Sequence, residues 1–270
     1  MNLDAYLARI GLDHRPPATL EGLRTLHAAH LLAIPYENLD VQLGVKVTIE
    51  RPAIFDKMVT RRRGGWCYEM NGLFGWALAE LGFRVTRSTG AVMRILGGES
   101  TVANHLVLRV DLEEGTYLAD VGFGDGPRAP FEIAPHEFES GGFHYGVEQA
   151  DGEWWRFINH PDGAAPCFDF KIAPADEAKF EAKCAELQVA PQSHFVLNLF
   201  CFKQRRDGVH MLRGRVLRDL RPGGKSDRLI ESADDLVATL HDVFTLDVPE
   251  AASLWPKVCR RHDELTAQGV

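Results

Sequence analysis

The chain has 270 residues, 45% hydrophobic and 25% charged, which is typical of a globular protein and argues against a disordered or fibrous chain. Its formal net charge of −8 argues against nucleic acid as the main partner, because a phosphate backbone requires a basic surface. No segment approaches the roughly 20 apolar residues of a membrane span, and no signal peptide core is present, so we expect a cytoplasmic protein without membrane contact.

Residues 1–83 show apolar spacings of three and four, which predict helices over residues 3–10, 20–32, 52–61 and 67–81. The last of these carries a core-facing stripe, and Gly82 suits its end. The stripe consists of Met70, Leu73, Phe74, Ala77 and Leu81. We expect residues 1–83 to form a helical domain.

The sequence RGGWCYEMN at residues 63–71 places one thiol, Cys67, at the start of the fourth predicted helix. A thiol in a first helical turn faces unpaired backbone N–H groups and the positive end of the helix dipole, which favour thiolate over thiol. Cys67 is therefore a candidate nucleophile. The alternative is an inert buried cysteine, since free cysteines are among the most buried residues.

The segment after residue 83 supplies a histidine and an acid. Two β-rich runs, residues 105–112 and 116–121, flank Glu113-Glu114 and predict a hairpin. With these glutamates at the tip, His105 lies opposite Gly122, and Asp120 is its diagonal neighbour on the same face. A slip of one residue would separate the pair. In the predicted register, Cys67, His105 and Asp120 form a triad in which His105 takes the thiol proton and Asp120 orients the ring.

The rest of the chain alternates between strand and helix signals. Short alternating runs to about residue 170 predict an antiparallel sheet or small barrel, with turns at residues 141–142 and 150–152. A helix is expected at residues 175–188, and strands at 195–202 and 209–216. Helices should follow at 233–244 and 249–265, the second interrupted at Pro256.

The five cysteines, at positions 67, 167, 184, 201 and 259, form no Cys-x-x-Cys pair and no Cys/His spacing typical of a metal site. An odd count without a secretion signal fits a reducing cytoplasm. We therefore expect free thiols and no metal.

Four segments together resemble the arylamine N-acetyltransferase family: IPYENLD, RGGWCYEMNGLF, ANHLVLRV and YLADVGFGDGP. The resemblance implies that Cys67, His105 and Asp120 are catalytic. It further implies that acetyl-coenzyme A acetylates the cysteine, which passes the acetyl group to a small aromatic amine or hydrazine in a ping-pong mechanism without a metal.

The resemblance also implies the fold and further site residues. The fold is α+β: a helical bundle at 1–83, an antiparallel β-barrel carrying the His and Asp at 84–190, and an α/β lid at 191–270, around a cysteine-protease-like core. It implies that the glycines after the acid, Gly122, Gly124 and Gly126, contact the coenzyme. It also implies that an apolar slot for the amine is formed by Phe123, Val92 and Phe202. An ion pair between Arg63 and Glu37 is implied to brace the cysteine loop. Asp125, within the glycine loop, would repel a phosphate.

Two other interpretations stay open at the level of sequence. A thiol hydrolase or transglutaminase-like enzyme would use the same Cys, His, Asp order but release its acyl group to water or act on peptide bonds. A non-enzymatic binding module would carry an inert Cys67 and leave the neighbouring His105 and Asp120 to chance. The sequence also leaves the oligomeric state open between monomer and homodimer.

Overall fold

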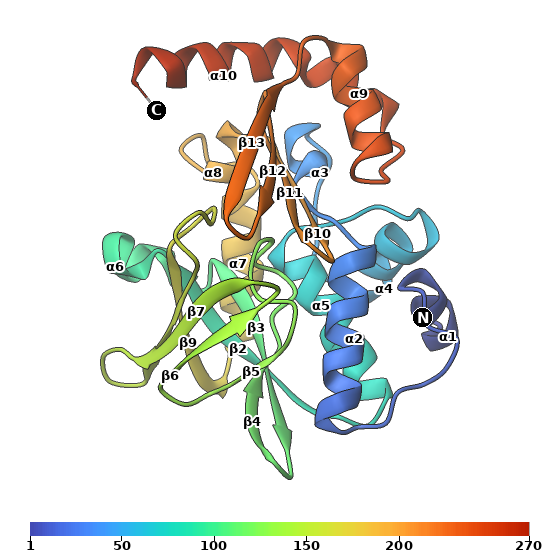
Figure 1. Ribbon diagram of the computed structural model, residues 1–270, viewed down its shortest axis with the longest axis vertical. Coiled ribbons are helices and arrows are strands. Elements are labelled where there is room, and N and C mark those ends of the chain that lie inside the picture. Colours follow the sequence, from blue (N-terminus) through green and yellow to red (C-terminus); the bar gives the residue numbers. More distant parts are fainter. Residues whose placement is uncertain (270) are drawn as a thin grey trace.

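The computed structural model describes residues 1–269 and has helices together with two antiparallel sheets, which confirms the α+β class (Figure 1). The N-terminal helices lie on one side of the view and the larger sheet on the other, with α9 and α10 beyond the end of the smaller sheet. The helical elements are α1 (Leu3–Arg9), α2 (Leu20–Ala33), α3 (Leu39–Gln42), α4 (Arg51–Phe55), η1 (Asp56–Thr60), α5 (Cys67–Glu80), α6 (Arg94–Gly97), η2 (Gly98–Thr101), α7 (Glu177–Leu187), α8 (His194–Leu197), α9 (Ala233–Asp242), η3 (Pro249–Leu254) and α10 (Trp255–Ala267).

The eight-stranded sheet has the order β5-β4-β3-β2-β9-β8-β7-β6, and the five-stranded sheet has the order β1-β10-β11-β12-β13. The edge strands β5 and β6 of the larger sheet approach one another through stacked Phe131 and Phe138 rings, 5.4 Å apart, so this sheet curls. The strands are β1 (Tyr36–Glu37), β2 (Arg84–Val92), β3 (His105–Leu112), β4 (Gly115–Leu118), β5 (Phe131–Glu132), β6 (His136–Ser140), β7 (Phe143–Gln149), β8 (Trp154–Ile158), β9 (Cys167–Pro174), β10 (Phe200–Arg205), β11 (Gly208–Arg213), β12 (Val216–Arg221) and β13 (Gly224–Leu229).

The four helices predicted in the first 83 residues are confirmed. The third differs in detail, because α4 continues into one π-helical turn, η1, instead of running as a single α-helix. Helix α5 is buried along almost its whole length, and it packs against β3 and β2. It therefore connects the N-terminal helices to the larger sheet.

The hairpin register predicted from the sequence is also confirmed. Strand β3 pairs with β4 so that Asp111 lies opposite Thr116 and Leu112 opposite Gly115, which leaves Glu113 and Glu114 at the tip. The helix expected at residues 175–188 is α7, whose N-cap Asp176 accepts a hydrogen bond from the N–H of Ala178.

The region after α7 departs from the prediction. Residues 194–197 form the short helix α8 where a strand was expected to begin, and β10 starts only at Phe200. The strand expected at 209–216 ends at Arg213, because Gly214 adopts a positive φ of 56° and turns the chain into β12. Strand β13 was missed: every residue of GKSDRL is exposed, so it has no apolar alternation to recognise.

At the C-terminal end, the expected break near Pro256 is confirmed: η3 ends at Leu254 and Pro256 lies in the first turn of α10, where proline is tolerated. These elements and α9 pack with the smaller sheet around a second apolar core that contains Leu212, Leu240 and Phe244. Among residues 1–269, no helix has the length and apolar character needed to cross a membrane.

Candidate active site

Cys67 is the first residue of α5, and its position is fixed by the two glycines before it. A side chain at Gly64 would collide with the carbonyl of Pro35, so only glycine permits this approach to β1. Glu69 accepts a hydrogen bond from the backbone N–H of Trp66 at 3.2 Å and so closes the first helical turn. Only 2% of Cys67 is exposed.

His105 and Asp120 are joined directly. The Nε2 atom of His105 lies 2.7 Å from Oδ2 of Asp120, and both side chains are buried. The other carboxylate oxygen, Oδ1, accepts from Asn71 Nδ2 at 2.7 Å and from the N–H of Gly122 at 2.8 Å. Each oxygen of Asp120 therefore has a donor, which fixes the carboxylate and through it the imidazole.

The contact between His105 and Asp120 determines the charge of each side chain. Burial alone would lower the pKa of His105, but the Asp120 carboxylate and the neighbouring Cys67 raise it to about 10. Burial would conversely raise the pKa of Asp120, but His105 and the donors from Asn71 and Gly122 lower it. At neutral pH, the buried pair is an imidazolium and a carboxylate.

Cys67 lies on the other side of the imidazole. Because Nε2 is engaged by Asp120, Nδ1 is the ring nitrogen available to the thiol. Sγ of Cys67 also lies 3.6 Å from the carbonyl oxygen of Asn104, the residue before His105. Asn104 is held in turn by Val92, whose N–H donates to its Oδ1 at 2.7 Å. The structure thus brings Cys67, His105 and Asp120 together, with the imidazole between the thiol and the carboxylate.

Cys67 and His105 open into a cavity of about 410 Å³ with mostly apolar walls. The three residues expected at an amine slot, Val92, Phe123 and Phe202, all line it. Phe123 packs edge-on against His105, with ring centroids 6.0 Å apart. The cavity therefore combines a thiol–imidazole pair with a surface suited to an aromatic ring.

The glycine loop is positioned mainly by packing. At Gly122, a Cβ would lie 2.8 Å from Cα of Cys67 and 2.6 Å from Nδ2 of Asn71, so glycine allows the hairpin to approach α5. Gly124 has a positive φ of 94° and packs against Phe202, and the carbonyl of Gly126 accepts from Gln204 at 2.9 Å. The contact of these glycines with a coenzyme stays a prediction.

Asp125 is fully buried beside the same cavity, and burial raises its pKa to about 6. Its Oδ2 accepts from the N–H of Ala164. A carboxylate in this wall makes the loop a poor partner for a phosphate.

A buried network of charges supports the cysteine loop. Nη2 of Arg63 lies 3.0 Å from Glu37 and 2.9 Å from Asp40, which places the expected Arg63–Glu37 pair in contact. Lys57 extends the network, since its Nζ lies 2.9 Å from both Asp40 and Glu69. The network links β1 and α3 to η1 and to the first turn of α5.

We expect Arg63→Ala to destabilise the protein strongly. It leaves the carboxylates of Glu37 and Asp40 buried without their guanidinium partner, which costs about 3–5 kcal/mol. Thermal unfolding should show the loss, whereas turnover of the fraction that remains folded should change little. A variant with wild-type melting and no activity would contradict this structural role.

Sequence reasoning missed three residues of the site. Asn71 follows Cys67 by four positions on α5, so helical spacing alone places both on one face. Asn104 adjoins His105, but its bonds to Val92 depend on the path of the chain between β2 and β3. Lys57 gives no signal, because a lysine near the end of a predicted helix is normally exposed.

Comparisons with known proteins agree with this geometry. A family model described as N-acetyltransferase matches residues 19–253. The arylamine N-acetyltransferase of Mycolicibacterium smegmatis is 36% identical over 267 residues, covering 93% of this chain and 94% of that protein. The arylamine N-acetyltransferase / N-hydroxyarylamine O-acetyltransferase of Salmonella typhimurium is 35% identical over 217 residues, covering 76% and 74%.

The chain is also similar in structure to solved arylamine N-acetyltransferases. The M. smegmatis arylamine N-acetyltransferase superimposes with a TM-score of 0.86 at 34% identity, covering 96% of this chain and 97% of the other. The Mycobacterium marinum arylamine N-acetyltransferase in complex with CoA also gives a TM-score of 0.86 at 34% identity, covering 97% and 99%.

Proposed function

The chain belongs to the arylamine N-acetyltransferase family of acyltransferases, and we propose that it moves an acetyl group from acetyl-CoA to arylamines and arylhydrazines by way of Cys67. The observation that carries this proposal is the contact of a fixed His105–Asp120 pair with a thiol at the start of a helix, beside an apolar cavity. Acetyl-CoA is then the co-substrate, and no step requires a metal.

In the first half-reaction, Sγ of Cys67 attacks the thioester carbonyl as a thiolate, with its proton held on His105. A bond forms between Sγ and the acyl carbon, and the bond from that carbon to the coenzyme sulfur breaks. The departing coenzyme thiolate takes the proton from His105. The backbone N–H of Cys67 has no acceptor within its helix, because it lies in the first turn, and we assign it to the oxyanion.

In the second half-reaction, the nitrogen of the amine attacks the acetyl carbon on Cys67 while His105 accepts a proton from that nitrogen. The thiolate of Cys67 leaves, which restores the starting ion pair. Asp120 holds the ring in the required orientation throughout. We assign Val92, Phe123 and Phe202 to the aromatic acceptor, since all three line the cavity around Cys67.

We further propose the three-part organisation of this family for the chain. Residues 1–83 would form the helical bundle, 84–190 the barrel and 191–270 the lid, with a cysteine-protease-like core at their junction. The loop with Gly122, Gly124 and Gly126 would border the thioester end of the coenzyme. A cytoplasmic location and a monomeric or homodimeric state complete the proposal.

Intact-protein mass spectrometry tests the reaction class. Mixing the protein with acetyl-CoA should add one acetyl group at Cys67, and an arylamine such as 5-aminosalicylate should remove it. Two-substrate kinetics should give parallel lines in double-reciprocal plots, since the first product leaves before the amine binds. Intersecting lines would show direct transfer in a ternary complex. Folded protein that forms no adduct and releases no CoA would favour the thiol hydrolase or transglutaminase-like reaction.

A further inference from the structure

Arg94 follows directly after one wall of the active-site cavity. Val92 and Met93 line that cavity, and Arg94, the next residue, begins α6. The chain leaves β2 here through a left-handed conformation at Met93, with a φ of 60° and a ψ of 32°. Because a Cβ makes this conformation unfavourable, Met93 keeps it only where surrounding contacts hold the backbone. The position of this part of the wall therefore depends on what anchors residues 92–94.

The segment after Met93 supplies no buried apolar anchor. Among residues 94–101, all of which the structure describes, none is buried, and Ile95 and Leu96 are 60% and 79% exposed. Figure 1 shows α6 at the left edge of the molecule, outside the strands of the larger sheet. On the near side of the turn, the N–H of Met93 donates to the carbonyl of Cys167 at 3.3 Å. The anchor on the far side is the side chain of Arg94.

Arg94 is held by a buried carboxylate on β9. Its Nη1 lies 3.0 Å from Oδ2 of Asp169, which is fully buried and also accepts from Arg156 of β8 at 2.7 and 3.0 Å. The guanidinium of Arg94 lies over the ring of Trp154, with Cζ 4.4 Å from the ring centroid. A charge-assisted hydrogen bond to a desolvated carboxylate is strong, and the aromatic ring adds to it. The second ion pair of Arg94, with Asp151 at 2.7 Å, involves an exposed carboxylate and contributes less.

The Asp169 carboxylate and the active-site cavity lie on opposite faces of the larger sheet. Phe168, the residue before Asp169, packs against His105 with ring centroids 5.0 Å apart. Since successive side chains of a strand point to opposite faces, Asp169 points away from His105. Arg94, Arg156 and Asp169 all belong to the described residues, and none of them lines the cavity. Arg94 therefore ties the end of the cavity wall to the far face of the sheet.

We propose that Arg94 is a positioning residue for the acceptor: through its ion pair with Asp169, it holds Val92 and Met93 in the wall that receives the aromatic amine. The inference rests on the proposed function and extends it to a residue outside the cavity. Cys67 and His105 are fixed separately, by α5 and by Asp120. Loss of the Arg94 ion pair should therefore affect transfer to the amine and leave acetylation of Cys67 intact.

Kinetics of the two half-reactions test the proposal. In a ping-pong mechanism, kcat/KM for acetyl-CoA reports acetylation of Cys67, and kcat/KM for the arylamine reports transfer from it. In Arg94→Gln, kcat/KM for 5-aminosalicylate should fall about tenfold, because the ring of the amine meets a wall that is no longer fixed. The value for acetyl-CoA should stay within about twofold of the wild type. Arg94→Lys keeps a cation for Asp169 and should recover most of the loss.

Arg156→Gln is the matched control. It removes the same charge from the same carboxylate and leaves one arginine on Asp169, but Arg156 lies on β8 and is not joined to the cavity wall. Its thermal unfolding should be weakened about as much as that of Arg94→Gln, and both kcat/KM values should remain those of the wild type.

Three outcomes would overturn the proposal, all measured below the unfolding transition of each variant. The first is an unchanged kcat/KM for the arylamine in Arg94→Gln. The second is an equal fall in Arg94→Gln and Arg156→Gln, which would show a general loosening of the sheet. The third is an equal fall for both substrates of Arg94→Gln, which would show an effect on Cys67. A folded wild type whose Cys67 is not acetylated by acetyl-CoA would instead contradict the proposed function.

Discussion

Cys67→Ser should retain the fold and lose essentially all acetyl transfer, by at least about 10⁴-fold. The two side chains differ by one atom at a site that is 2% exposed, and the His105–Asp120 pair does not depend on the thiol. A serine hydroxyl is far harder to deprotonate than a thiol, so the resting ion pair with His105 cannot form. Arylamine turnover and thermal unfolding, measured on the same preparation, check both parts of this expectation.

Cys184→Ala is the matched control. Cys184 is also buried and lies on α7 outside the active-site cavity, and burial raises the pKa of its thiol to about 12. This variant should keep its turnover, and iodoacetamide should label Cys67 first in the wild type. Full activity in Cys67→Ser would exclude an acyl-cysteine intermediate, and slow labelling of Cys67 would favour the binding-module interpretation.

The parts of the site that the sequence predicts are those fixed by local geometry. The start of α5 follows from the apolar stripe and from the glycines before Cys67, of which Gly64 leaves no room for a side chain beside Pro35. The relation of His105 to Asp120 follows from a two-residue hairpin tip, since turn length sets the register. Both arguments need only neighbouring residues, and both agree with the structure.

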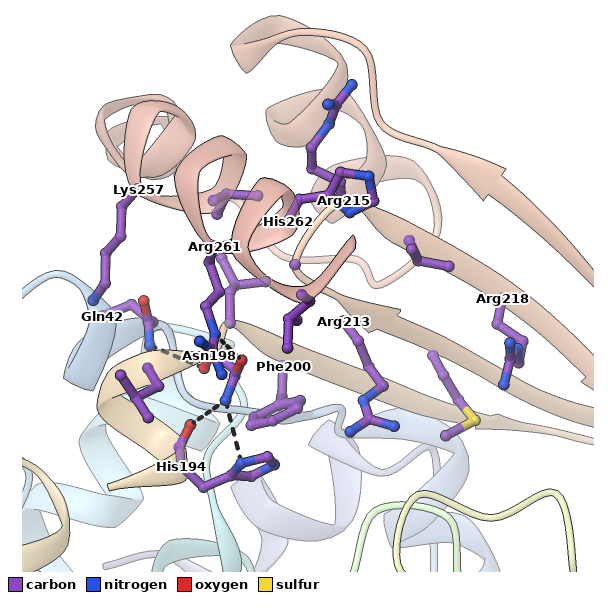
Figure 2. A pocket seen from close by; sticks show the side chains of 17 residues that line it. Gln42, His194, Asn198, Phe200, Arg213, Arg215, Arg218, Lys257, Arg261 and His262 are labelled. Carbon is purple, nitrogen blue, oxygen red and sulfur yellow. Dashed lines mark hydrogen bonds between the residues drawn. The ribbon is translucent and has the colours of Figure 1, made fainter. Parts of the chain in front are cut away.

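The features of the structure that the sequence did not predict depend on long-range contacts. A cavity of about 390 Å³ between the smaller sheet, α8 and α10 (Figure 2) draws its arginines and lysine from β11, β12, the turn between them and α10, and each of these taken alone is an ordinary surface cation. The Lys57 ammonium is buried only because Asp40 and Glu69 meet it from two other segments. Strand β13 forms through backbone pairing with β12, and all of its side chains are exposed, so its sequence carries no apolar pattern.

Asp120→Asn should reduce acetyl transfer by about 10³- to 10⁴-fold without unfolding the protein. Oδ1 can still accept from Asn71 and Gly122, so the new amide nitrogen would face Nε2 of His105. An amide N–H in that place requires Nε2 to be an acceptor, and the ring proton then resides on Nδ1. That nitrogen faces Cys67 and can no longer take the thiol proton.

The rate of Cys67 alkylation at neutral pH separates this effect from a loss of structure. In the wild type, the pKa of His105 is about 10, so the imidazolium persists from neutral pH until the pH rises through that value. This positive charge beside Cys67 favours a reactive thiol, and alkylation should be fast at neutral pH. In Asp120→Asn the carboxylate no longer opposes the burial of His105, the pKa of the ring falls, and alkylation at neutral pH should be slow. Asp111→Asn, on the same hairpin but paired with Arg109, should keep the wild-type rate, whereas a wild-type rate in Asp120→Asn would show that Asp120 does not set the charge of His105.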